Sequence, residues 1–131
     1  MQVKVSVMVV DDDVSVRDTL CENLEECGFA VTAAKDGQEA LQMIEEGYAP
    51  AVVITDLIMP RTEGLEVIMS IRRQYPNIRL IAISGGGRNK SADFLHMAAK
   101  LGADAVLPKP LNIDELETTI RQLIVQPVPD L

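Results

Sequence analysis

The stretch AVVITD at residues 51–56 decides the fold class of this chain. Its β-branched and apolar residues continue almost without a charge, which is typical of a strand buried on both faces of a parallel sheet. The only charged residue of the stretch, Asp56, stands where such a strand would end. Because parallel strands are joined by crossover connections, usually helices, the stretch predicts a helix before it and another after it.

Strand-like and helix-like segments alternate on both sides of this central strand. Runs of β-branched and apolar residues predict four more strands, at 3–10, 29–34, 78–84 and 104–107. Helical spacing of apolar residues, with capping residues at several starts, predicts five helices, at 14–27, 36–46, 65–74, 91–101 and 112–124. The methionines on these helices, Met43 and Met69 among them, are expected to pack in the core.

Five strands that alternate with five helices indicate an α/β fold of the (βα)5 type. We expect a doubly wound, flavodoxin-like sandwich whose parallel sheet has the strand order 2-1-3-4-5. Residues 1–124 are expected to form one domain, and the proline-bearing residues 125–131 to be a C-terminal tail or a truncated linker.

The composition argues against several classes of function. Of the 131 residues, 20 are Asp or Glu and 12 are Lys or Arg, which gives a net charge of −8. A surface this acidic repels phosphate groups. We therefore expect no direct nucleic-acid binding and no membrane binding. No apolar run approaches the ~20 residues of a membrane span, and no signal sequence opens the chain. Cys21 and Cys27 would face different sides of one helix, so we expect reduced thiols and a cytoplasmic protein.

Acidic side chains and two donors are expected at the carboxyl ends of the strands. Parallel strands place these ends at one edge of the sheet, here called the rim. The rim residues follow or end four different strands: Asp11, Asp12, Asp13, Asp56, Ser84 and Lys109. Two carboxylates about 4 Å apart repel by roughly 4 kcal/mol at an effective dielectric constant near 20, so this cluster needs a proton, a lysine or a metal ion. Oxygen ligands at such a rim suit Mg²⁺ or Mn²⁺, although Asp13 alone is more simply explained as a helix N-cap.

Four motifs at these positions resemble those of response-regulator receiver domains. They are VVDDD at 9–13, ITDLIMP at 54–60, AISG at 82–85 and LPKP at 107–110. All four stand in the family's order, and the similarity extends from about Lys4 to Ile124. Any one motif would be weak, but the set of four is highly specific.

The resemblance implies that Asp56 is a phosphoacceptor beside a divalent metal. It makes Asp11 and Asp12 the family's acidic pair, with Asp12 and Asp56 binding Mg²⁺ or Mn²⁺ directly and Asp11 acting largely through water. The main-chain carbonyl of Ile58 would be the remaining protein ligand.

The same resemblance assigns Ser84 as the switch hydroxyl and Lys109 as the family's lysine. The peptide bond from Lys109 to Pro110 is typically cis in this family. Val106, however, stands where the family usually has Tyr or Phe, and the segment after Ser84 is longer than usual and opens with Gly85, Gly86 and Gly87. We therefore expect the switch to use this glycine-rich loop more than strand five.

The implied function is phosphorelay signal transduction in a two-component system. The expected partners are a sensor histidine kinase or a phosphotransfer protein and a downstream protein target, with a homodimer as one expected result of phosphorylation. Such a domain catalyses only its own phosphorylation and dephosphorylation, so we do not expect an enzyme that turns over an external metabolite.

Two other interpretations are open. A pseudo-receiver that is never phosphorylated would share the fold, although the intact set of Asp11, Asp12, Asp56, Ser84 and Lys109 argues against it. An aspartyl-phosphate phosphatase of the haloacid-dehalogenase type is suggested by Asp11-x-Asp13. That motif prefers Thr or Val where Ser15 stands, and that family usually has a longer chain.

Overall fold

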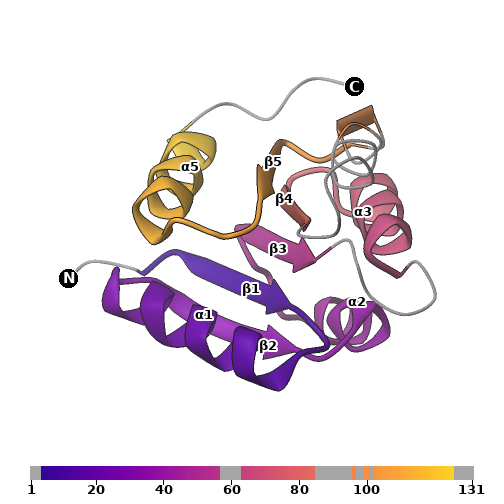
Figure 1. Ribbon diagram of the computed structural model, residues 1–131. Helices are drawn as coiled ribbons and strands as arrows, with labels where there is room; N and C mark the ends of the chain where they lie inside the picture. Colours follow the sequence, from indigo (N-terminus) through magenta and orange to yellow (C-terminus); the bar gives the residue numbers. More distant parts are fainter. Residues whose placement is uncertain (1–3, 57–62, 85–95, 97–98, 101, 126–131) are drawn as a thin grey trace.

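A five-stranded parallel sheet forms the centre of the molecule. The computed structural model describes residues 4–56, 63–84, 96, 99–100 and 102–125. The sheet has the order β2-β1-β3-β4-β5, as predicted (Figure 1). Its strands are β1 (Ser6–Val10), β2 (Ala30–Ala34), β3 (Val52–Asp56), β4 (Arg79–Ser84) and β5 (Ala105–Pro108).

Helices cover both faces of this sheet. They are α1 (Val14–Glu26), α2 (Gly37–Glu45), α3 (Glu63–Gln74) and α5 (Ile113–Val125). Helices α1 and α5 lie on one face, and α2 and α3 lie on the other (Figure 1). The doubly wound sandwich is thereby confirmed, while most of the predicted helix at 91–101 lies outside the described residues. The first strand begins at Ser6, where pairing with Ala30 begins, instead of at residue 3.

The core consists of two clusters, one on each face of the sheet. Alternate residues of β1 point to opposite faces, so Val7 and Val9 pack toward α1 and α5 while Met8 and Val10 pack toward α2 and α3. Strand β3 is buried along its whole length, as its sequence predicts. Met43 packs against the α2–α3 cluster, but the prediction that Met69 does so is wrong, since Met69 is 51% exposed. The inner positions of α3 are taken by Val67, Ile68 and Ile71.

Side-chain caps begin three of the helices. Asp13 accepts a hydrogen bond from the main-chain N–H three residues on, and Asn112 does the same before α5. Asp36 Oδ1 accepts from the N–H of Glu39 at 2.8 Å, and Glu39 Oε1 accepts from the N–H of Lys35 at 3.1 Å. Asp36 and Glu39 therefore form a capping box in which Glu39 accepts from the residue before the cap. These bonds determine where the loops at the rim turn into helices.

Two further sequence expectations concern the cysteines and the membrane. Cys21 and Cys27 are both free thiols, as predicted. In the part of the chain that the structure describes, no helix has the length and apolar character needed to cross a bilayer.

Candidate functional site

The strand order brings the predicted site residues to one edge of the sheet. Asp56 is the last residue of β3, and Asp11 follows the neighbouring strand β1. Ser84 ends β4 opposite Pro108 of β5, and Lys109 comes next in the chain. The described main chain therefore places all four residues on the rim, as the sequence predicts.

A lysine–carboxylate pair forms the centre of the site. Lys109 Nζ lies 2.7 Å from Asp56 Oδ2. The Asp56 side chain is only 7% exposed and that of Lys109 is 31% exposed. Burial by itself would lower the pKa of Lys109, but the hydrogen bond to Asp56 and the charges of Asp56, Asp11 and Asp13 together raise it. Lys109 is therefore a fixed cation beside a nearly buried carboxylate, and its peptide bond to Pro110 is cis, as predicted.

A second buried carboxylate belongs to the acidic turn, residues 11–13. Asp11 is 4% exposed, and its Oδ1 accepts a hydrogen bond from the N–H of Asp13 at 2.9 Å. Burial raises the pKa of Asp11, the bond from Asp13 opposes this, and the negative charge of Asp56 raises the pKa further. Asp12, between them, is exposed. The rim therefore holds two buried acids that repel each other, Asp11 and Asp56, and two exposed acids, Asp12 and Asp13.

The carboxylates of the rim can hold a hard divalent ion only if main-chain oxygen atoms or water molecules supply the remaining ligands. Among the described residues, no group of three or more His, Cys, Asp or Glu side chains could hold a metal ion. The carboxylates of Asp11 and Asp56 are nevertheless oxygen donors whose mutual repulsion a cation would relieve. The predicted ligand Ile58, the side chain of Ser84 and the loop at 85–87 lie outside the described residues.

Comparison with known proteins identifies the family. Residues 7–121 match the family model of the response regulator receiver domain. The chain belongs to this family. It is thus a receiver domain of the kind found in two-component systems, and the family resemblance of its four motifs is confirmed.

Individual relatives agree with this assignment. The domain is 36% identical over 126 residues to the response regulator MprA of Mycolicibacterium vanbaalenii, a match that covers 96% of this chain and 53% of that protein. It is 32% identical over 120 residues to the sensor kinase CckA of Brucella abortus, covering 91% of this chain and 12% of that protein. A receiver domain protein of Clostridium thermocellum superposes with a TM-score of 0.84 at 29% identity, covering 92% of this chain and 94% of that one. The chain thus spans about half of the first relative's length.

One residue of the receiver's site was not predicted from the sequence. Arg17 donates from Nη1 to the main-chain oxygen of Asp11 at 2.8 Å. The only signal was a basic residue in the first turn of the helix that follows the acidic turn. Val106, at the family's aromatic position, is half-buried and packs against the α2–α3 cluster. It therefore acts as a core side chain.

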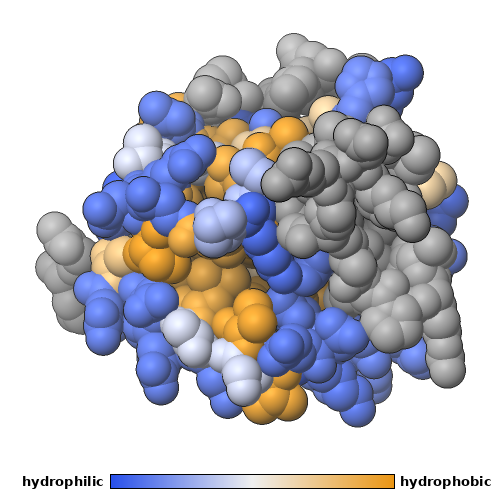
Figure 2. Space-filling view, in the orientation of Figure 1, coloured by the Kyte–Doolittle hydropathy of each residue, from blue (hydrophilic) through white to orange (hydrophobic). Residues whose placement is uncertain are grey.

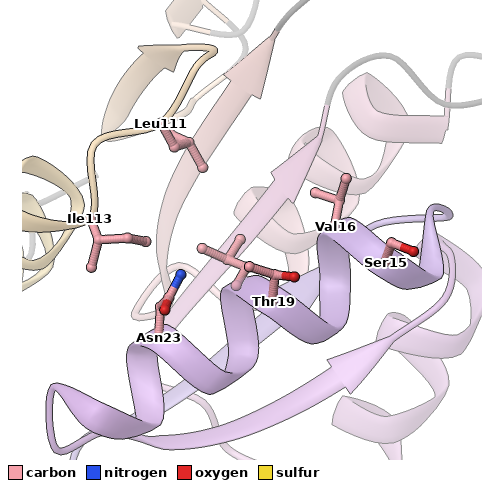
Figure 3. Close-up of a pocket in the computed structure, with 7 residues that line it drawn as sticks. Ser15, Val16, Thr19, Asn23, Leu111 and Ile113 are labelled. Atoms are coloured by element: carbon pink, nitrogen blue, oxygen red, sulfur yellow. The ribbon is translucent and has the colours of Figure 1, made fainter.

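An apolar groove leads from the receiver's rim along α1. One part, of about 350 Å³, lies between α1 and the start of α5 (Figure 3). A second part, of about 430 Å³, reaches Lys109. The two parts share Val16 and Leu111, so we describe them together as the α1–α5 groove. Figure 2 shows orange apolar surface between α1 and α5, bordered by hydrophilic side chains. The lining residues are Ser15, Val16, Thr19, Leu20, Asn23, Lys109, Pro110, Leu111 and Ile113.

Proposed function

We propose that this receiver domain accepts a phosphoryl group on Asp56. The observation that carries the proposal is the pair of Asp56 and Lys109, whose atoms Oδ2 and Nζ are 2.7 Å apart at the carboxyl ends of the strands. A buried carboxylate needs a compensating charge, and a lysine at the end of another strand supplies it without covering the site. Asp56 is the last residue of β3, so its carboxylate lies at the rim and not inside the sheet.

The reaction is an in-line transfer to a carboxylate. An oxygen of Asp56 attacks the phosphorus of a phosphohistidine, the P–N bond breaks, and the electron pair stays on the imidazole nitrogen of the donor. The product is an acyl phosphate on Asp56. Lys109 holds one carboxylate oxygen through its hydrogen bond and so restricts rotation of the nucleophile. As negative charge moves onto the aspartyl phosphate, the same ammonium group stabilises it.

The proposed cofactor is Mg²⁺ or Mn²⁺. When bound, such an ion would stabilise negative charge on the phosphoryl oxygens. Asp12 and Asp56 would bind it directly, with Asp11 acting through water and the carbonyl of Ile58 as a further ligand. The surroundings of Asp11 support this assignment, because burial raises the pKa of its carboxyl group and the negative charge of Asp56 raises it further.

The proposed donor is a sensor histidine kinase or a phosphotransfer protein. A donor protein must bring its phosphohistidine to the rim, and the α1–α5 groove offers apolar surface that ends at Lys109. The adjoining helices carry exposed acids, among them Asp18 and Asp114, so a helix with apolar residues and basic neighbours would be complementary. Phosphorylation would then change contacts with a downstream protein target or with a second copy of the domain.

Binding of beryllofluoride, a phosphoryl mimic, tests this function. With Mg²⁺ present, we expect amide NMR shifts at residues around Asp56 and Lys109 in the wild type and in Asp18→Asn, which removes an exposed acid of α1 that is not one of the rim residues. Asp56→Asn should show none of these shifts. A wild-type spectrum that beryllofluoride and Mg²⁺ leave unchanged would favour a pseudo-receiver that is never phosphorylated.

A further inference from the structure

The acidic turn is bound at both ends by a single residue, Arg17. The main-chain N–H of Arg17 donates to the oxygen of Asp13 at 2.9 Å, as the first bonds of a helix do. Its side chain then extends back and donates from Nη1 to the oxygen of Asp11 at 2.8 Å. The turn that carries Asp12 therefore begins and ends on groups held by Arg17.

The main-chain oxygen of Asp11 needs the bond from Arg17 because it lies beyond the end of the neighbouring strand β2. The N–H of Asp11 continues the ladder with β2, donating to the oxygen of Ala34 at 3.2 Å. Strand β2 ends at Ala34, and Asp36 already caps α2, so the neighbouring chain turns away just beyond this point. A main-chain oxygen at such a strand end must find another donor. The guanidinium group of Arg17, half-buried on α1, supplies it.

Arg17 acts on the turn through hydrogen bonds to its main chain. The Asp11 carboxylate itself is held by a different bond, from the N–H of Asp13. With both ends of the turn held, the N–H of Asp13 stays on Asp11 Oδ1 at 2.9 Å. That bond determines the direction in which the Asp11 carboxylate faces.

We propose that Arg17 is a positioning residue that pre-organises the acidic turn for a divalent cation. The inference rests on the proposed function, because the cation is the one required for phosphorylation of Asp56. Arg17 itself does not touch the reacting groups. Without it, Asp11 and Asp12 remain in the chain but lose their fixed arrangement, and the cation must order them on binding.

A second arginine, Arg121 of α5, provides a control variant, because it bonds the main chain just after the end of α1. Arg121 also donates to a main-chain oxygen, that of Cys27, at 2.9 Å. Arg121 also forms an ion pair with Glu117 and stacks over the ring of Phe29, and none of these partners is a rim residue. Arg17→Met and Arg121→Met each remove an arginine that donates to a main-chain oxygen, and only Arg17 does so at the acidic turn.

Binding of Mn²⁺ to the unphosphorylated full chain, followed by electron paramagnetic resonance of the free ion, measures the effect. We expect Arg17→Met to raise the Kd by about tenfold, the lower end of the range for groups that orient metal ligands. Arg121→Met should bind as the wild type does. At saturating Mn²⁺ the rate of labelling by acetyl phosphate should return to the wild-type value in Arg17→Met. In metal-free protein, the amides of Asp13 and Val16 should exchange faster in Arg17→Met only.

Three results would overturn the proposal: an unchanged Kd in Arg17→Met, an equal rise in Arg121→Met, or unchanged amide exchange at Asp13. Failure of the wild type to bind Mn²⁺ at all would instead contradict the proposed function. Amide exchange in the metal-free variants would then still decide whether Arg17 holds the turn.

Discussion

Replacing Lys109 with methionine should destabilise the domain by leaving Asp56 without its cation. Removing one partner of a fully buried ion pair costs about 3–5 kcal/mol, because an uncompensated charge stays in the interior. Asp56 meets that condition with a side chain 7% exposed, but Lys109 is 31% exposed, so water already screens part of the attraction. We therefore expect a loss of about 2 kcal/mol, within the range for a hydrogen bond to a charged group. For a domain of this size that is roughly 7 °C in Tm.

Urea unfolding at pH 7 in EDTA, followed by circular dichroism, measures this loss. Lys35→Met, which removes an exposed lysine, is the control and should unfold at the wild-type midpoint. The double variant Asp56→Asn/Lys109→Met loses the buried carboxylate together with the lysine that pairs with it, and should regain most of the lost stability. A Lys109→Met variant as stable as the wild type, or a double variant no more stable than Lys109→Met, would show that Lys109 does not compensate a buried charge on Asp56.

The pKa of Lys109 determines how the stability difference between wild type and Lys109→Met depends on pH. The folded protein raises this pKa above its ordinary value of 10.5, so the folded state binds the proton more tightly than the unfolded state. The stability contributed by Lys109 is then fully present below pH 10.5 and is lost as the pH rises through the raised pKa. The difference in unfolding free energy between wild type and Lys109→Met should therefore be constant around neutral pH and should narrow in alkali.

Three further substitutions have definite expected outcomes. Asp11→Asn should raise Tm at neutral pH, because burial and a neighbouring carboxylate raise the pKa of Asp11 and its charged form destabilises the fold. The gain in Tm should vanish below pH 3.8, and a gain that persists there would contradict this cause. Val16→Asp in the α1–α5 groove should slow transfer from a phosphorylated donor protein roughly tenfold but leave labelling by acetyl phosphate unchanged, whereas equal loss from both donors would argue against docking there. Asp104→Ala should cost about 3 kcal/mol in urea unfolding. It removes the acceptor of Arg72 at 2.6 Å and the neighbour of buried Arg79 at 3.8 Å, so a near-neutral change would show that these arginines find other partners.

The sheet, and the meeting of the site residues at its rim, could be predicted from the sequence because both depend on local patterns. A run such as AVVITD is buried along its length, and alternation of strands with helices leaves few ways to order a parallel sheet. Once the order is known, residues that follow different strands, such as Asp11, Asp56 and Lys109, must meet at one edge.

Contacts that depend on side-chain direction could not be predicted in this way. Arg17 reaches Asp11 only because its side chain turns back along α1, and spacing does not determine that choice. Asp104 and Arg72 are 32 residues apart and no motif connects them, yet they form a 2.6 Å ion pair. The exposure of Met69 likewise depends on which face of α3 meets the sheet, and neighbouring apolar residues took the inner positions.

The most direct test of the account is the site of phosphorylation. The full chain is incubated with acetyl phosphate and Mg²⁺, and its intact mass and peptides are measured by mass spectrometry under conditions that preserve acyl phosphates. We predict one added phosphoryl group, located on the peptide that contains Asp56, absent in EDTA and absent in Asp56→Asn, while Asp18→Asn is labelled like the wild type. A wild-type chain that gains no phosphoryl group, or an Asp56→Asn chain that gains one as readily, would contradict the account.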